Sequence, residues 1–343
     1  MKNKESLGIF EKYLFVWVAV CMVIGLLMSV FIPTIGKSID AWKIGGVSIP
    51  IGVCLFFMMY PALLNIQLTE LKKLAKNPKP ILLTLLSNWI VAPLICAFLA
   101  YTFLKGESQL IIALILLGSS PCTAMVLVWG SLAKGNQEQN VINTTLNTIT
   151  IMFLYVPVVS LLTGMQNIQL DRIALMISVG VFIGIPLVIG YISKQMIIKY
   201  KGELWFNDIY RNIIGKISII ALLTTLVVIF SLNGQVLLNN PKSMLLVSIP
   251  LLLGHIIIVG YNIFVTRIAK LKYKEASITV LIGSSSHFEI AIASAVGLFG
   301  VGSMAALGTT MGLFLEVPLM LGVVYVLRYL KSKNFWPNNS ADA

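Results

Sequence analysis

The chain has 343 residues, of which 58% are hydrophobic and only 11% are charged, and its mean hydropathy is +0.92. Soluble globular proteins average about 45–50% apolar and about 25% charged residues, so this composition excludes a soluble enzyme and indicates a membrane protein. In a soluble chain the net charge of +12 would suggest nucleic-acid binding, but here the basic residues fall in short clusters between apolar blocks. They therefore indicate membrane topology, and no nucleic-acid partner is expected.

A series of apolar blocks follows, each with the roughly 20 residues that a helix needs to cross a bilayer. In chain order the ten predicted spans are 13–33, 47–66, 80–104, 109–133, 141–164, 171–198, 212–232, 242–266, 275–300 and 306–330. Short loops join these spans and leave no room for a soluble domain. The first block is long enough to span and no small-residue cleavage site follows it, so a membrane helix is expected there rather than a signal peptide.

The basic residues predict the orientation of these spans. Twenty of the 25 Lys and Arg residues fall on one side of the alternation and five on the other. Because Lys and Arg concentrate in cytoplasmic loops, this bias predicts that both termini face the cytoplasm. The expected location is the cell membrane, crossed many times.

The spans divide into two groups of five, residues 1–167 and 168–343. Two short motifs recur at a single offset of 165 residues: Gly-Ser-Ser at 118–120 and 283–285, and Thr-Thr at 144–145 and 309–310. An odd number of spans per half places the second half upside down in the membrane relative to the first. Such inverted repeats are typical of secondary transporters. The predicted fold is therefore an all-α membrane protein of ten helices in two inverted five-helix repeats.

Two spans carry features that interrupt a helix at matching places. Pro121 lies in the middle of span 109–133, where it removes a backbone donor and clashes with the preceding turn. Span 275–300 contains a glycine and three serines at 283–286, which weaken the helix and supply polar groups. Matching interruptions in the two halves point to a transporter's binding site, so we expect these two broken helices to cross there.

Acidic residues inside the membrane are the second indication of a site. Of the 13 acidic residues, only Glu289 and Glu316 lie in the interior of predicted spans, and the other eleven fall in loops, at span ends or in the termini. A carboxylate near the bilayer centre costs about 2.5–3.5 kcal/mol, so such residues usually face a cavity and carry function. The alternative for Glu289 is pairing within the helix bundle, and for Glu316, two residues before Pro318, packing near a kink.

The four cysteines lie in apolar stretches without a Cys-x-x-Cys pair, so neither a disulfide framework nor a zinc site is expected. Cys21, Cys54 and Cys96 are interpreted as small buried hydrophobic residues. Cys122 differs because it directly follows the mid-span proline of the repeated segment, where the 165-residue offset aligns it with His287. It is therefore a candidate for lining a binding pocket.

The segment at 121–129, Pro-Cys-Thr-Ala-Met-Val-Leu-Val-Trp, resembles the arsenite efflux permeases of the arsenical-resistance-3 class, within the bile acid/arsenite/riboflavin transporter superfamily. Phe-Glu-Ile-Ala-Ile-Ala at 288–293 and Leu-Glu-Val-Pro at 315–318 agree with that family, and the ten-span layout matches over nearly the whole chain. The chain departs from the family pattern at Ser120, before the Pro-Cys pair, and at 286–287, where Ser-His precedes the Phe-Glu pair. These departures leave open whether span 275–300 couples transport to the same ion as in the family.

The resemblance implies an exporter of arsenite that exchanges As(III) for protons and is not an enzyme, and it leaves open whether antimonite is also carried. It implies that Cys122 and an acid of the ninth span, best matched by Glu289, are required for transport. As(III) is thiophilic, and one thiol among hydroxyl groups suits transient capture because transport needs binding weak enough to be reversed. Glu289 is then the expected proton carrier, and no cofactor is expected. The predicted site residues are Cys122 as the metalloid contact, with Glu289, Glu316, Ser119, Ser120, Thr123, Ser286 and His287 around it.

Two other functions are compatible with the residues. A sodium-coupled carrier of organic anions with the same fold would use the hydroxyl groups at 284–286 and Glu289, and would ignore Cys122. An intramembrane thiol enzyme would use Cys122 as nucleophile and His287 as base.

Overall fold

The computed structural model of the chain describes residues 14–32, 34, 38, 42–44, 47–64, 77–123, 125–165, 168–239, 241–300 and 302–337. Within these ranges the regular structure is helical except for one antiparallel pair of two-residue strands, β1 (Lys43–Ile44) and β2 (Val47–Ser48). The predicted cytoplasmic termini, residues 1–13 and 338–343, lie outside the described residues.

Helices occupy most of the described residues of the predicted spans, and within the described ranges six helical stretches are long and apolar enough to cross a membrane. They are Pro78–Phe103, Gln137–Gly164, Arg172–Lys201, Glu203–Leu232, Pro241–Ile268 and Met304–Ser332. Large apolar side chains such as Phe98 and Phe153 are about 70% exposed on the outer faces of these helices, at 68% and 72%. Such a surface is unfavourable in water and suits lipid, so the chain is an all-α membrane protein.

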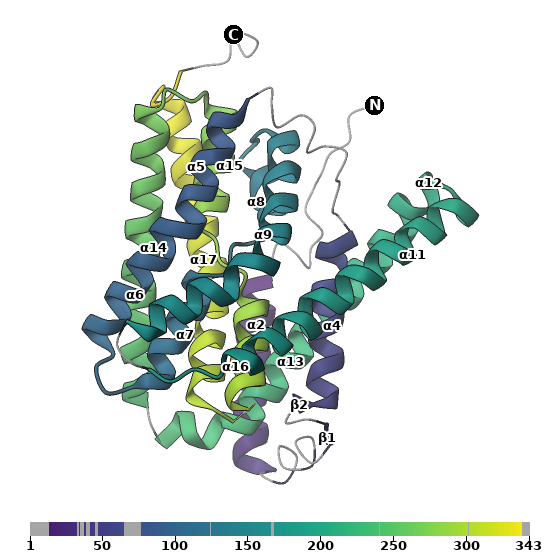
Figure 1. Ribbon diagram of the computed structural model, residues 1–343, viewed down its shortest axis with the longest axis vertical. Coiled ribbons are helices and arrows are strands. Elements are labelled where there is room, and N and C mark those ends of the chain that lie inside the picture. The colour runs from purple at the N-terminus through teal and green to yellow at the C-terminus, as the bar shows by residue number, and fades with distance from the viewer. Residues whose placement is uncertain are drawn as a thin grey trace.

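Four helices form the group that we call the first bundle: α2 (Leu14–Phe31), α4 (Ile49–Leu64), α11 (Ile185–Lys201) and α13 (Arg211–Asn239). A glycine lets two of them approach closely, because a Cβ atom on Gly25 of α2 would lie 2.7 Å from the Cβ atom of Phe230 on α13. The chain enters α13 through α12 (Glu203–Trp205) and the π-helical turn η4 (Phe206–Tyr210). Figure 1 shows α11 running diagonally across α4.

Most of the remaining helices form the second bundle, which holds most of the buried polar residues. Its members are α5 (Pro78–Leu86), the π-helical turn η2 (Ser87–Val91), α6 (Ala92–Phe103), α7 (Ser108–Gly118), α8 (Met125–Leu132), α9 (Gln137–Gly164), α14 (Pro241–Ile268), α15 (Tyr273–Ser284), α16 (Phe288–Phe299) and α17 (Met304–Ser332). Helix α9 begins four residues before the predicted span because the Asn136 side chain accepts the Gln139 N–H and caps it. Figure 1 shows α14, α17 and α15 standing side by side along the long axis.

One helical stretch connects the two bundles. It starts as α10 (Arg172–Val179), passes through the π-helical turn η3 (Gly180–Gly184) and continues as α11. Helix α10 packs on α16 of the second bundle, whereas α11 packs on α4 of the first. The contact with α16 is close, since a Cβ atom on Gly297 would lie 3.2 Å from the Cβ atom of Ser178.

Both predicted helix interruptions are present. Helix α7 ends at Gly118 and α8 begins at Met125, with Pro121 between them. Helix α15 ends at Ser284 and α16 begins at Phe288. The second bundle therefore contains two pairs of short helices, each joined by non-helical chain deep in the protein. We call residues 119–123 the first break and residues 285–287 the second break.

Candidate functional site at the crossing of two broken helices

The two non-helical segments cross and pair through their main chains. Pro121 lies opposite Ser286 in an antiparallel bridge. The Cys122 N–H donates to the Ser285 carbonyl over 3.3 Å, and the His287 N–H donates to the Ser120 carbonyl over 2.6 Å. A buried peptide group needs a hydrogen-bond partner, and each non-helical segment provides such partners for backbone groups of the other. We call this pairing the crossing.

Side chains from three helices satisfy backbone carbonyls that the breaks leave free. The Asn147 amide on α9 donates to the Cys122 carbonyl over 3.0 Å, and its oxygen accepts from the Asn88 amide over 3.1 Å. The Ser87 hydroxyl and the Asn262 amide both donate to the Gly283 carbonyl, over 2.7 and 3.1 Å. Non-helical backbone at membrane depth is tolerated only where such partners exist, so these contacts stabilise the crossing.

Glu316 reaches the crossing from α17. Its carboxylate accepts hydrogen bonds from the Ser285 hydroxyl over 2.6 Å and from the Ser286 N–H over 2.9 Å, and it accepts a further one from the Ser286 hydroxyl. Hydrogen bonds to an ionised acceptor are about twice as strong as those between neutral groups. Glu316 therefore holds the second break from the side of α17.

His287 joins the two breaks through its side chain. Its Nδ1 atom lies 3.1 Å from the Thr123 hydroxyl of the first break, and its Nε2 atom lies 3.5 Å from Oε2 of Glu289 in the first turn of α16. His287 is 2% exposed and Glu289 is 7% exposed. The unwound backbone thus brings together two side chains that a regular helix would direct to different faces.

The other predicted site residues gather at the same place. Cys122 is buried in the crossing and its backbone is bonded on both sides. The Ser119 hydroxyl is buried and has no hydrogen-bond partner among the described residues. The structure thus brings to one crossing all eight of the residues that the sequence singled out.

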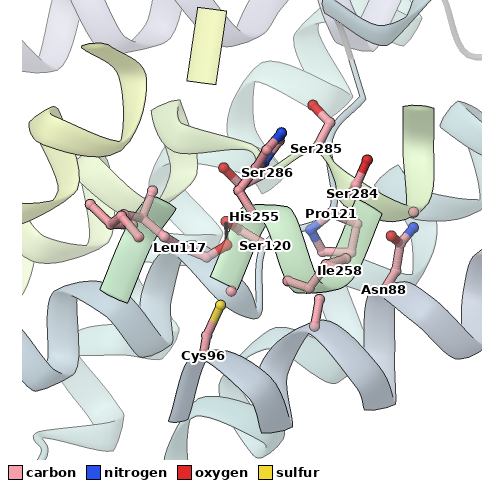
Figure 2. A pocket seen from close by; sticks show the side chains of 14 residues that line it. Asn88, Cys96, Leu117, Ser120, Pro121, His255, Ile258, Ser284, Ser285 and Ser286 are labelled. Atoms are coloured by element: carbon pink, nitrogen blue, oxygen red, sulfur yellow. Dashed lines mark hydrogen bonds between the residues drawn. The ribbon is translucent and has the colours of Figure 1, made fainter. Parts of the chain in front are cut away.

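A cavity of about 70 Å³ lies beside the crossing, between η2, α6, α14 and α15 (Figure 2). Of the predicted residues, Ser120 and Ser286 line it, whereas Cys122, Glu289 and Glu316 do not. Asn88, Cys96 and His255 also line it, and none of these three is among the site residues predicted from the sequence. Their neighbours in the sequence are mostly apolar, so nothing local distinguishes them from core residues.

The sequence of the chain places it among known transporters. Residues 52–240 match the model of the Sodium Bile acid symporter family, which is more than half of the chain. The chain belongs to this family. Like other members of the sodium bile acid symporter family it is a membrane transporter and not an enzyme, and the hypothesis of a thiol enzyme is therefore set aside.

Within that family the chain belongs to the arsenical-resistance class. It is 35% identical to the arsenical-resistance protein Acr3 of Alkaliphilus metalliredigens, over 94% of this chain and 93% of that protein. It is 29% identical to the Acr3 of Corynebacterium glutamicum, over 97% of this chain and 92% of that protein. An uncharacterized transporter of Synechocystis is 38% identical, over 98% of this chain and 92% of that protein. The chain is therefore a transporter of the arsenical-resistance type.

Proposed function

We propose that this transporter exports arsenite from the cytoplasm in exchange for protons. The observation that carries the proposal is the crossing itself, where Cys122 lies one residue from Thr123, which His287 links to Glu289. A soft ligand for As(III) and an acid that can bind a proton thus come together between two broken helices. The names of the Acr3 relatives point to the same class of cargo.

The size of the cavity favours a small, uncharged cargo. Its volume of about 70 Å³ is well below the roughly 300–1,000 Å³ of pockets that hold drug-sized ligands. Neither a Lys, an Arg nor a carboxylate lines it among the described residues, so a large organic anion would find neither room nor a counter-charge. Arsenite at neutral pH is an uncharged trihydroxide and suits both features.

The two acids have different proposed roles. Glu316 accepts three hydrogen bonds from the second break, which suits a fixed anion that organises the crossing. Glu289 lies 3.5 Å from the His287 imidazole, a longer contact than those of Glu316. We assign to Glu289 the proton that is exchanged for arsenite. Cys122 is the proposed metalloid contact, with hydroxyl groups of Ser119, Ser120 and Thr123 nearby in the chain.

The proposed architecture is two inverted repeats of five spans, 1–167 and 168–343. The crossing supports it, because Pro121 and Ser286 are opposite each other and are separated by the repeat offset of 165 residues. The bundles support it too, since the first bundle takes the first two spans of each half and the second bundle takes the last three. In a cell membrane with both termini in the cytoplasm, rocking of one bundle against the other would expose the crossing to each side in turn.

Transport of arsenite into everted membrane vesicles tests this proposal. We expect uptake that depends on a proton gradient, is lost in Cys122→Ser and Glu289→Gln, and is kept in Cys54→Ser, a matched change in the first bundle. Full transport by Cys122→Ser would exclude the thiol role, and full transport by Glu289→Gln would exclude the proton role. Uptake that needs sodium instead of a proton gradient would favour the second candidate, a sodium-coupled carrier. The description of the family, which names sodium, is the reason to test it.

A further inference from the structure

A second cavity lies at one end of the second bundle, away from the crossing, and its wall is basic. It has a volume of about 370 Å³ and lies where the end of α17 meets the loop after α8 and the first residue of α15. The polar residues that line it are Lys134, Tyr273, Arg328, Lys331, Ser332 and Asn334. We call this cavity the basic pocket.

Three cationic side chains line the basic pocket, and no acidic residue lines it within the described part of the chain. Lys134 comes from the loop between α8 and α9, whereas Arg328 and Lys331 come from the last turns of α17. None of the three forms an ion pair with a described carboxylate. A cleft lined by charges of one sign concentrates counter-ions, so the basic pocket favours an anion.

Contacts with α15 fix the wall that carries Lys134. The Tyr273 hydroxyl donates to the Ala133 carbonyl over 2.7 Å. Gly135 lies so close to α15 that an added Cβ atom would be 2.5 Å from Cδ1 of Ile278. A site whose walls are already held in place loses less entropy when a ligand binds, so this wall is prepared for a ligand.

The ring of Tyr273 positions a second cation. The Nζ atom of Lys331 lies 4.9 Å from the centroid of this ring. Tyr273 is 3% exposed, and the Trp336 ring packs against it at a centroid distance of 6.1 Å. A cation–π contact holds an ammonium group without removing its charge, so Lys331 remains able to bind an anion.

The groups around the basic pocket suit a phosphate group. An arginine such as Arg328 can donate two parallel hydrogen bonds to phosphate oxygens, and a lysine adds a point charge. Ser332 contributes a hydroxyl group to the lining and Asn334 an amide. A volume of about 370 Å³ falls in the range of about 300–1,000 Å³ that is typical of pockets for organic ligands. The esterified phosphate of a lipid headgroup therefore fits as well as free phosphate.

Two exposed tyrosines place the basic pocket at the level of the lipid headgroups. Tyr325 and Tyr329 lie one turn apart on α17, on either side of Arg328 in the sequence, and are 72% and 61% exposed. Tyrosine is enriched where a membrane helix meets the membrane surface. In the proposed orientation this end of α17 is cytoplasmic, the side on which basic pockets between membrane helices bind anionic headgroups.

We propose that the basic pocket binds a phosphate group, carried by the headgroup of an anionic phospholipid or by free phosphate. The proposal depends neither on the cargo nor on the coupling ion proposed above. All three helices that meet at the pocket lead to the crossing. Helix α8 begins just beyond the first break, α15 ends at the second, and α17 carries Glu316, about 18 Å from Arg328 along the helix. A phosphate group that bridges Lys134 and Arg328 therefore stabilises the helices that form the crossing.

Thermal unfolding of the full chain in detergent tests the proposal in two arms. In the first, dioleoylphosphatidylglycerol is titrated, with zwitterionic dioleoylphosphatidylcholine as control. In the second, inorganic phosphate is compared with chloride at equal ionic strength. A ligand that binds only the folded chain raises the unfolding midpoint. A rise with phosphatidylglycerol alone would assign the site to a lipid, and a rise with phosphate would assign it to the free anion too. No rise in either arm would overturn the proposal.

Paired variants show whether the ligand binds at this pocket. Lys134→Gln with Arg328→Gln changes two exposed side chains, so the midpoint without ligand should stay that of the wild type. The half-saturating ligand concentration should rise about tenfold or more, because hydrogen bonds to charged groups are lost. Each single variant is measured as well, so that the test does not depend on the double variant alone.

Lys199→Gln with Lys201→Gln is the matched control, since it removes two exposed charges at the end of α11, outside the pocket. Its half-saturation should stay within about twofold of the wild type, because salt screens distant surface charges. An equal shift in the two pairs would mean that general surface charge attracts the ligand, and would overturn the site.

Discussion

At the scale of single residues, the crossing depends on side chains that bind backbone rather than on apolar packing. Glu316 accepts from both an N–H and hydroxyl groups of the second break, and Asn147 donates to the carbonyl of the first. In lipid an unsatisfied peptide group costs several kcal/mol, so each of these side chains stabilises the non-helical chain that the site requires. Stability and transport are therefore expected to fall together when they are changed.

Glu316→Ala is predicted to lower the thermal stability of the detergent-purified protein and to abolish arsenite transport. The change leaves three donors of Ser285 and Ser286 without an acceptor, at about 1–3 kcal/mol for each unsatisfied group. Glu316→Gln keeps one oxygen acceptor and should destabilise less. The measurement is the midpoint of thermal unfolding, with the exposed acid change Glu203→Gln as control. A midpoint for Glu316→Ala equal to that of the control would show that these hydrogen bonds contribute little.

At the scale of elements, the broken helices could be predicted from the sequence because their causes are local. Pro121 cannot continue a helix, and the glycine and serines at 283–286 weaken one, whatever surrounds them. The binding of Glu316 to Ser285 could not be predicted, since the two are 31 residues apart and meet only through the packing of α17. Cys96 is buried, as the sequence predicted, but its place in one cavity wall with His255 could not be predicted, since the two residues come together only through the packing of α6 and α14.

The packing of α17 on α7 lets us predict how a substitution on α17 changes the wall of the cavity beside the crossing. A Cβ atom on Gly312 of α17 would lie 2.7 Å from both Cδ atoms of Leu117, which lines the cavity. Gly312→Ala should push Leu117 towards the cavity, weaken arsenite transport and destabilise the protein by about 1–3 kcal/mol, the usual cost of overpacking. Gly322→Ala on the same helix is the control, since no described atom outside the neighbouring backbone of its own helix lies within 4 Å of the added Cβ. Equal transport and equal unfolding midpoints for the two variants would contradict this account of the wall.

At the scale of the whole molecule, one continuous helical stretch runs from the second bundle into the first. Helix α10 contacts α16, which begins at the crossing, while its continuation α11 contacts α4 of the first bundle. Any rocking of the bundles must change the angle along this stretch or slide α10 on α16. The π-helical turn η3 between α10 and α11 is the place where the helix departs from regular geometry.

A covalent link between α10 and α16 is predicted to stop transport. In a chain with Ser178→Cys and Gly297→Cys the two Cβ atoms would lie about 3.2 Å apart, close to the roughly 3.5–4.5 Å of disulfides. We expect arsenite uptake in the reduced state, loss of uptake on oxidation and recovery with a reductant. The wild type receives the same oxidant to account for its own cysteines. Uptake that continues in the oxidised double variant would mean that α10 and α16 move as one body.

The walls of the cavity beside the crossing contain amide, hydroxyl, thiol and imidazole groups, and neither an ammonium nor a carboxylate lines it within the described part of the chain. A neutral solute held there carries no charge across the membrane electric field. Any current recorded from this protein in a planar bilayer would then be carried by the exchanged ions alone. The ratio of this current to the arsenic flux would give the number of ions exchanged for each arsenite.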